Sequence, residues 1–243
     1  MTESRGSIVD GAVLAIELSH RAGTVAIRPT HGADVHQASV PPSTDREDHL
    51  MHVIDALCRA HGVGPRDLRV VAVSVGPGGF TGLRVACATA QALVHACGAV
   101  PVAVPSAEVV VRTVGFGHAS AWPEGQRFAV VLAAKGDDAW VTRGAVTRGA
   151  VRVERAGLET WSTFASEPPD GDVFVDPSAQ GHWAEISGAR RADWSAAACL
   201  QAAEAGLREG TARTAPREMV PLYPRVAEAV ALWEARHGGP RTE

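Results

Sequence analysis

A glycine-rich loop between an apolar run and a helical run constrains the fold of this chain more than any other feature. Residues 76–82 hold four glycines and one proline. The preceding residues 68–75 are almost continuously apolar, as in a strand that is covered on both faces. Residues 83–97 repeat apolar side chains at helical spacing, and a short strand is predicted at residues 101–104. This order predicts parallel strands joined by right-handed crossovers in an α/β fold.

The loop itself has two interpretations. Glycines permit positive φ angles, and an uncapped helix N-terminus suits an anion, so the candidate anion contacts are Gly76, Gly78, Gly79 and Thr81. The loop does not end in Gly-Lys-Ser/Thr, and no acidic ribose-binding residue accompanies it, so neither common nucleotide motif is present. We favour the other interpretation, a turn that lets the following helix pack closely on the sheet.

Two predicted β-hairpins give the chain an internal duplication. The first hairpin is expected from residues 12–18 and 24–28, and the second, of similar length and polarity, from residues 128–133 and 139–147. Two halves that each open with an antiparallel hairpin resemble the actin-like (ASKHA) ATPases, whose lobes have a ribonuclease H-like fold.

We expect this duplication to divide the chain into residues 1–115 and residues 116–243. In the first half, a helix over residues 46–58 is predicted, with Asp45 as its N-cap. In the second half the pattern is weaker: strands are predicted at residues 151–153 and 173–175 and a helix at residues 195–209, and the tail from Gly238 is expected to be disordered.

Charge and cysteine usage exclude several classes of protein. Lys and Arg number 23 against 27 Asp and Glu, a net charge of −4, so the chain is not expected to hold tRNA or another nucleic acid by itself. The cysteines, Cys58, Cys87, Cys97 and Cys199, have no framework spacing and are interpreted as small buried apolar residues. No membrane helix or secretory signal is apparent, which favours a cytoplasmic protein.

Few residues match a catalytic or metal-binding pattern. His49 and His52 share one face of a predicted helix, but no third ligand and no H-E-x-x-H motif accompany them, so no metal site is expected. Glu17, on the first strand, is the acidic residue best placed to lie near magnesium in an actin-like ATPase. No G-x-S-x-G motif and no cysteine in an electropositive setting is found, so no catalytic residue and no cofactor is assigned.

A specific family resemblance starts from the same glycine loop. Residues 76–84 read Gly-Pro-Gly-Gly-Phe-Thr-Gly-Leu-Arg and are followed by Ala-Thr-Ala at 88–90, by Pro101 and by Val-Pro-Ser at 104–106. This pattern closely resembles the signature of the TsaB (YeaZ) family, bacterial accessory proteins for the synthesis of threonylcarbamoyladenosine in tRNA. The resemblance is clear over residues 12–115 and weaker beyond.

The chain also departs from that family. Residues 17–19 read Glu-Leu-Ser where the family has Asp-Thr-Ser, and Arg46 stands where the family has a histidine. The hairpin Ala-Arg-x-x-Glu-Val-Tyr is represented by residues 134–140, whereas residues 221–225 keep the family's P-x-Y-x-R pattern.

The resemblance implies a scaffold subunit without catalysis of its own, which binds and activates the TsaD-like transferase. In the family the two proteins join through helices of their first halves, the ATPase TsaE binds the pair, and TsaB-like proteins alone form homodimers through the same surface. The two predicted first-half helices carry more apolar surface than one sheet contact requires. We therefore expect the following residues at the partner interface: Leu50, Val53, Leu57, Leu83, Val85, Cys87, Ala90 and Val94.

Two enzyme classes remain as alternatives. The first is a nucleotide-binding phosphotransferase or hydrolase of the actin-like superfamily, with Glu17 near magnesium, and it predicts ATP turnover by the isolated chain. The second is a metallopeptidase, which is disfavoured because the sequence supplies no metal-ligand cluster.

Overall fold

The computed structural model describes residues 11–30, 34–42, 49–116, 122–133, 137–224 and 236. Its strands form two five-stranded sheets. The first sheet consists of β1 (Ala12–Glu17), β2 (Thr24–Arg28), β3 (His36–Ser39), β4 (Leu68–Gly76) and β5 (Val100–Pro105). The second consists of β6 (Arg127–Ala133), β7 (Asp138–Thr147), β8 (Ala150–Thr160), β9 (Asp172–Val175) and β10 (Arg190–Arg191).

The two sheets have the same topology. The strand order is β3-β2-β1-β4-β5 in the first sheet and β8-β7-β6-β9-β10 in the second. In each, the first strand pairs antiparallel with the second and parallel with the fourth. The predicted α/β fold with duplicated halves, each opening with a hairpin, is therefore confirmed.

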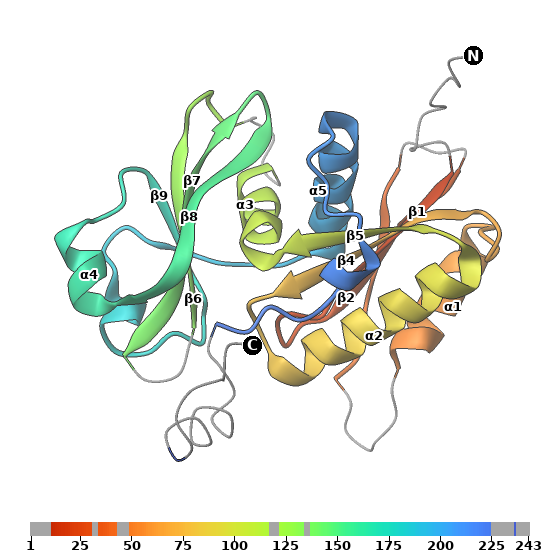
Figure 1. The fold of residues 1–243 in the computed structure, drawn as a ribbon, viewed down its shortest axis with the longest axis horizontal. Coiled ribbons are helices and arrows are strands. Elements are labelled where there is room, and N and C mark those ends of the chain that lie inside the picture. Colours follow the sequence, from red (N-terminus) through yellow and green to blue (C-terminus); the bar gives the residue numbers. More distant parts are fainter. Residues whose placement is uncertain are drawn as a thin grey trace.

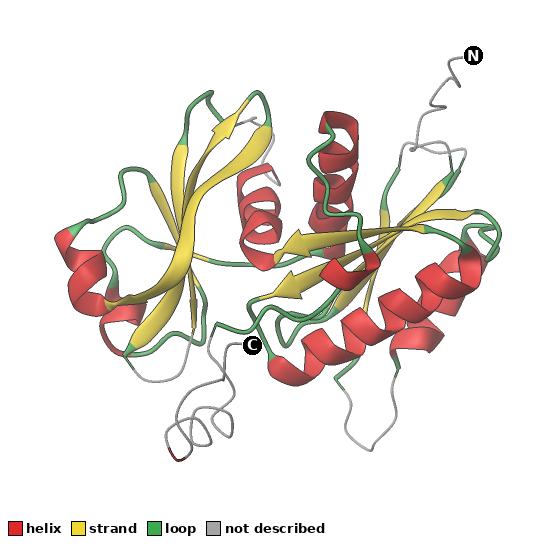
Figure 2. Ribbon diagram, in the orientation of Figure 1, coloured by secondary structure: helices red, strands yellow, loops and turns green. Residues whose placement is uncertain are grey.

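The helices form three layers around these sheets. They are α1 (Leu50–Ala60), α2 (Phe80–Cys97), α3 (Ser106–Phe116), α4 (Trp161–Ser166) and α5 (Ala196–Glu209), with two short 3-10 helices, η1 (Gly181–Glu185) and η2 (Pro216–Glu218). Helices α1 and α2 cover the outer face of the first sheet, α3 and α5 lie between the sheets, and α4 lies beyond the second sheet (Figures 1 and 2).

The central strand β1 is buried on both of its faces, as its continuous apolar sequence requires. Leu14 and Ile16 point toward α1 and α2 and belong to one core cluster. Val13 and Ala15 point the other way and pack in a second cluster, which includes side chains of α3, α5 and the second sheet. One core therefore holds the two sheets together through the helices between them.

The two first-half helices begin at different residues from those predicted. Helix α1 begins at Leu50 rather than at residue 46, and its N-cap is His49; the predicted cap, Asp45, lies outside the described residues. Helix α2 begins at Phe80 rather than at Leu83, because Gly79 already has the extended N-cap conformation and its carbonyl accepts from the Leu83 N–H.

The second half contains more regular structure than its sequence pattern indicates. Strand β8 is 11 residues long, although only residues 151–153 are predicted as a strand, and α4 is not predicted at all. Most β8 side chains are exposed, and the β7–β8 register shifts at Arg143 and Gly144. Exposure and a bulge together remove the alternation of apolar and polar residues by which a strand is recognised.

Helix α5 does not stay with the second half of the chain. It packs against β1 and β2 of the first sheet as well as against α3, and its Glu204 accepts a hydrogen bond from Arg28 on β2. The expected division at residue 115 separates the two sheets along the chain. It does not separate the two lobes in space, because α5, from the second half of the chain, packs on the first sheet.

The chain after α5 also returns to the first lobe. Residues 211–224, which we call the strap, pair with β5 at Ala103 and cross the start of α2. Met219 is fully buried, and its carbonyl accepts from Gln91 on α2. The Leu222 N–H donates to the Val75 carbonyl, at a distance of 2.7 Å.

The described helices were also compared with the length and apolarity that a bilayer demands. Within the described ranges, no helix meets both requirements for crossing a membrane.

We predict that Gly82→Ala destabilises the fold by about 1–3 kcal/mol, because a Cβ on Gly82 overlaps the Leu18 carbonyl oxygen and forces the start of α2 away from the first hairpin. The free energy of unfolding, measured in urea, tests this. Gly157→Ala is the matched control: a Cβ there meets nothing, so its effect stays within about 0.5 kcal/mol. Equal effects of the two substitutions contradict the role assigned to the close approach.

Candidate functional site

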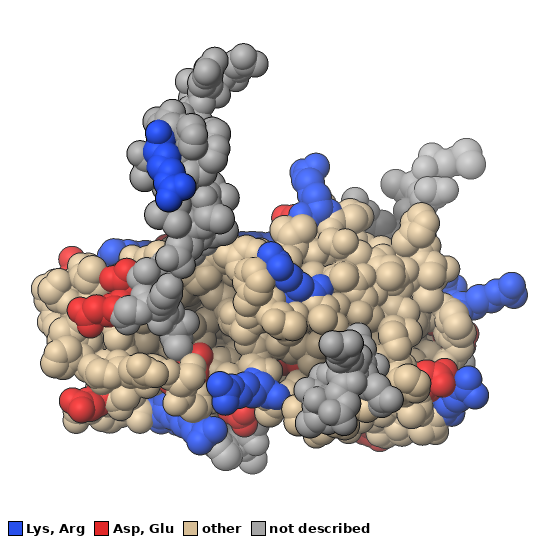
Figure 3. All heavy atoms as spheres, turned by 90° about the horizontal axis from the view of Figure 1, so that it is seen from below, with Lys and Arg blue, Asp and Glu red and all other residues tan. Residues whose placement is uncertain are grey.

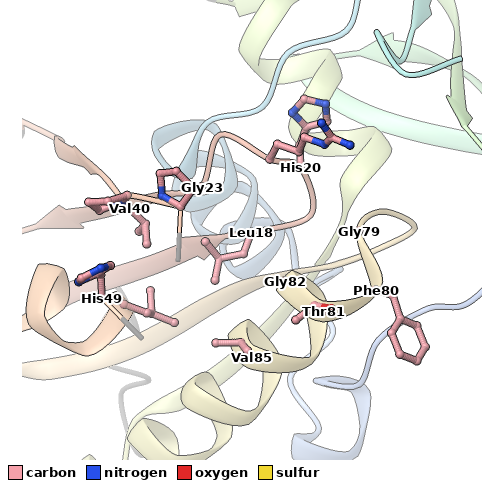
Figure 4. Close-up of a pocket in the computed structure, with 14 residues that line it drawn as sticks. Leu18, His20, Gly23, Val40, His49, Gly79, Phe80, Thr81, Gly82 and Val85 are labelled. Atoms are coloured by element: carbon pink, nitrogen blue, oxygen red, sulfur yellow. The ribbon is translucent and has the colours of Figure 1, made fainter. Parts of the chain in front are cut away.

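A hollow lies at the amino-terminal ends of α1 and α2. It has a volume of about 600 Å³. We call it the α1–α2 hollow. Its lining comes from the β1–β2 turn, the segment after β3 and the starts of the two helices: Leu18, His20, Arg21, Gly23, Val40, Pro41, Pro42, His49, Leu50, Gly79, Phe80, Thr81, Gly82 and Val85. In Figure 4, Leu18 and Val85 approach the same space from the turn and from α2, whereas Phe80 points away from them.

The glycine loop shapes one wall of this hollow by packing directly on the first hairpin. The Gly79 N–H donates to the Ser19 carbonyl at 2.7 Å. A Cβ on Gly78 overlaps that same carbonyl, and one on Gly82 overlaps the carbonyl of Leu18. The glycines are thus required for close backbone approach, which agrees with the interpretation of the loop as a packing turn.

The four candidate anion contacts are not equivalent in this arrangement. The Gly79 N–H is already used by Ser19, and Gly76 has a φ of +104° and faces the strap. Thr81 is exposed in the first turn of α2 and lines the hollow. Anion binding at Gly76, Gly78, Gly79 and Thr81 stays a prediction.

The residues expected at the partner interface separate into two groups. Five of them lie in the core between the helices and the first sheet and are at most 9% exposed: Leu50, Leu57, Leu83, Cys87 and Ala90. Their expected direct contact with a partner is corrected, because the strongest apolar stripe of each helix is the one that packs on its own sheet. The other three, Val53, Val85 and Val94, are half-buried and reach the outer surface.

Two exposed apolar side chains, which the sequence analysis did not expect at an interface, lie at the starts of α1 and α2. Met51, in the first turn of α1, is 46% exposed, and Phe80, in the first turn of α2, is 52% exposed. Neither residue belongs to the main apolar stripe of its helix. An apolar residue outside that stripe is the sequence signal from which the exposure of Met51 and Phe80 could have been predicted. Pro41 and Pro42, which end the segment after β3, are also exposed in the lining.

Glu17 lies at the end of β1 on the face that points between the sheets. It is only 1% exposed. Its Oε1 accepts hydrogen bonds from the backbone N–H of Ser19, at 2.6 Å, and from the Ser19 hydroxyl. Its Oε2 is buried without a hydrogen-bond partner among the described residues. The carboxyl group is therefore held by its own turn and is closed off from solvent.

Burial raises the pKa of Glu17 above its usual value, and the hydrogen bonds from Ser19 oppose the rise. Desolvation is the larger effect, so the neutral acid is favoured. An enclosed carboxyl group with a raised pKa is less suited to hold magnesium than an exposed one, whereas the alternative phosphotransferase or hydrolase interpretation requires that of Glu17.

Two histidine rings, those of His36 and His61, stack with centroids 3.6 Å apart, but His49 and His52 are not part of a cluster of ligands among the described residues. His52 is exposed and His49 is half-buried at the rim of the hollow. Within the described residues, no three His, Cys, Asp or Glu side chains converge as a metal-ligand set. Cys58, Cys87 and Cys199 are buried as predicted, Cys97 is half-buried, and burial raises the pKa of Cys58 and of Cys87 to about 11.

A contact that the sequence did not predict joins the two lobes beside the hollow. The ring of His20, in the β1–β2 turn, stacks on Trp194 with centroids 4.4 Å apart. His20 Nε2 also lies 3.9 Å from the carboxylate of Asp176, which follows β9. These residues are far apart in the sequence and follow no periodic pattern, so only the fold brings them together.

We predict that Glu17→Gln changes the pH dependence of stability. Because the folded-state pKa of Glu17 is raised, the wild-type chain loses stability as pH rises above about 4.5, by up to about 1.4 kcal/mol per pH unit until the folded-state pKa is passed. The Gln variant lacks this loss, so its relative stability grows over that range. Urea unfolding of both proteins from pH 4.5 to 8 measures the difference in their free energy of unfolding.

Glu154→Gln is the control, since Glu154 is half exposed and pairs with Arg127 at the surface. If the stability difference between wild type and Glu17→Gln does not vary with pH, the buried neutral state of Glu17 is wrong.

Comparisons with known proteins agree with this architecture. Residues 39–164, just over half of the chain, match the family model described as TsaD, tRNA N6-adenosine threonylcarbamoyltransferase. The comparison with curated proteins gives no match.

Two solved structures share the whole fold. One is a Pseudomonas aeruginosa protein described as uncharacterized with similarity to peptidase YEAZ, with a TM-score of 0.73 and 20% identity, covering 88% of this chain and 100% of its own. The other is YeaZ from Pseudomonas aeruginosa, with a TM-score of 0.68 and 21% identity, covering 88% of this chain and 99% of its own. These likenesses agree with the α/β fold of two similar five-stranded sheets.

The family match includes α1, the glycine loop, α2 and the second hairpin, so it contains most of the lining of the hollow. The chain therefore belongs to the TsaD family of tRNA N6-adenosine threonylcarbamoyltransferases, and its fold is that of the YeaZ (TsaB) proteins.

Proposed function

We propose that this chain is a non-catalytic subunit that binds and activates a TsaD-like transferase, the enzyme that makes threonylcarbamoyladenosine next to the tRNA anticodon. The observation that carries the proposal is the α1–α2 hollow, which opens on the outer surface of the first lobe and lies mostly inside the family match. A concave apolar surface of this kind accepts anchor side chains from a protein partner.

The side chains at the surface of α1 and α2 support docking on this face. Met51, which follows the lining residue Leu50 in the sequence, is exposed, and Val85 lines the hollow. Ala88, one turn further along α2, is exposed and small, which lets a partner helix approach closely. We propose that these residues, with Val53 and Val94, form the docking face in place of the buried residues of the same helices.

The state of Glu17 supports a role without catalysis. In the actin-like interpretation, this carboxyl group is the one nearest a magnesium ion, yet here it is enclosed and hydrogen-bonded to Ser19. Its raised pKa favours the neutral form. We accordingly assign the transfer chemistry to the partner.

The other members of the assembly follow from the family resemblance. We propose that a TsaE-like ATPase binds the pair, that the chain alone forms a homodimer through the same face, and that tRNA is reached only through the TsaD-like partner. Figure 3 supports the last point for one face of the molecule, where Lys and Arg side chains are scattered singly rather than gathered in a stripe.

The direct experiment is light-scattering size-exclusion chromatography of this chain, alone and mixed with the TsaD homologue of the same organism, with an ATPase assay of each sample. We expect a one-to-one complex, and no ATP turnover by the isolated chain. Turnover by the isolated chain without complex formation favours the alternative enzyme function.

We predict that Met51→Glu lowers the affinity for the TsaD-like partner by about 10-fold or more, since a charge is then buried in the apolar contact. Val85→Glu is expected to act in the same direction. Isothermal titration or biolayer interferometry measures the affinity, and circular dichroism checks the fold. Because Met51 is 46% exposed, its substitution leaves the fold intact.

Val153→Glu is the matched control, as Val153 is 47% exposed on β8 in the other lobe. It is expected to leave the affinity unchanged. If Met51→Glu and Val153→Glu bind the partner equally well, the docking face lies elsewhere.

A further inference from the structure

A second hollow lies where the two lobes meet, and we call it the interlobe hollow. It has a volume of about 260 Å³, and its lining comes from β5, α3, the start of β8, the end of α5 and the strap. Helices α3 and α5, which both contribute to it, pack on each other between the two sheets (Figure 1). Its lining shares no residue with that of the α1–α2 hollow.

The interlobe hollow combines both signs of charge. Its lining holds three arginines and two glutamates: Glu108 and Arg112 from α3, Arg152 from β8, Glu209 from α5 and Arg213 from the strap. Two ion pairs join four of them, one within α3 at 3.2 Å and one between β8 and α5 at 3.1 Å. Arg213 is the charge that these pairs leave over.

The guanidinium of Arg213 is available to a ligand. Its side chain has no hydrogen bond or ion pair with any described residue. The backbone of Arg213 is nevertheless fixed, because its carbonyl accepts from the Ala103 N–H on β5 at 3.0 Å. A guanidinium on an anchored backbone at the border of a hollow suits a carboxylate, which it binds through two parallel N–H groups.

The carboxyl group of Glu108 lacks part of the positive charge that it needs. Burial raises the pKa of Glu108, and Arg112 and Arg213 oppose the rise without cancelling it. Glu209, on the neighbouring helix, adds to the rise. An ammonium group beside Glu108 supplies the missing compensation and favours the ionised carboxylate.

The buried part of the lining is aliphatic and leaves room for a small molecule only. Val102, Val104 and Ala202 are each at most 4% exposed. At roughly 30 Å³ for each water-sized group, the volume of about 260 Å³ corresponds to about eight heavy atoms. This is below the roughly 300–1,000 Å³ of pockets for larger ligands.

A simple inorganic anion matches this lining less well than a molecule with both charges. The last turn of α5 contributes Gly206 and Glu209 to the hollow. A helix carries partial negative charge at its carboxyl end, and Glu209 adds a full negative charge there. An anion that binds Arg213 without a cation of its own therefore faces repulsion from two sides.

We propose that the interlobe hollow binds a free aliphatic α-amino acid of the size of valine. Its carboxylate pairs with Arg213, its ammonium group faces Glu108, and its side chain packs on the valines of β5. Both charges of the ligand then have partners, as the transfer of a zwitterion from water into a hollow requires. The inference does not depend on the proposed function, because the two hollows have separate linings.

The test is a titration of the 15N-labelled full chain with L-valine, followed by the backbone amide resonances. We expect saturable shifts at residues 102–104, 150–153 and 206–213. Arg213→Gln is expected to weaken binding by about 10-fold or more, because a charge-assisted hydrogen bond is lost. The matched control is Arg217→Gln, an equal change of charge at an exposed site on the same strap but outside the lining, and it leaves the affinity unchanged. The absence of saturable shifts, shifts confined to other residues, or equal effects of the two variants overturns the proposal.

Three further compounds test which groups of the ligand are recognised. In 3-methylbutanoate the ammonium group of valine is missing, in 2-methylpropylamine the carboxylate is missing, and inorganic phosphate is an anion alone. Each is expected to bind at least about 10-fold more weakly than valine. If phosphate or 3-methylbutanoate binds as tightly as valine, the hollow is an anion site and the role given to Glu108 is wrong. Equal binding of 2-methylpropylamine contradicts the role given to Arg213.

Discussion

The close approach of the glycine loop to the first hairpin decides how the first lobe is built. The carbonyls of Leu18 and Ser19 occupy the space that side chains at Gly78 and Gly82 would need, and the Gly79 N–H closes the contact with a hydrogen bond. This contact positions the start of α2 against the β1–β2 turn. The hollow between them, the exposure of Phe80 and the path of the strap all follow from that position.

Local sequence signals predicted several elements of both lobes well. Both hairpins, the buried strand β4 and helix α2 combine continuous apolar runs with glycines and prolines that allow few alternatives. Most of strand β8 was missed, because most of its side chains are exposed and the strand carries a bulge, and helix α4 was missed altogether. Contacts such as those of His20 with Trp194 and Asp176 depend on long-range folding and leave no periodic trace.

At the candidate site, the periodicity of apolar residues predicts which helix face is buried but not which residues are exposed. An apolar stripe identifies the face of a helix that is buried, and for α1 and α2 that face packs on the first sheet. Leu50 and Ala90 belong to these stripes and were expected at an interface with a partner. In the structure both are core residues. The residues beside the stripe that reach the surface include Val85, which the sequence analysis expected at the interface, and Met51, whose exposure only the packed structure reveals.

The return of α5 to the first sheet bears on how the protein is made. During synthesis, β1, β2 and β4 emerge long before residues 196–209, and until then their face toward α5 has no complete cover. The first lobe therefore cannot finish folding as an independent unit while the ribosome is still extending the chain. For this fold, the last step of assembly in the first lobe waits for nearly the whole polypeptide, and one face of its apolar strands stays uncovered until α5 has been made.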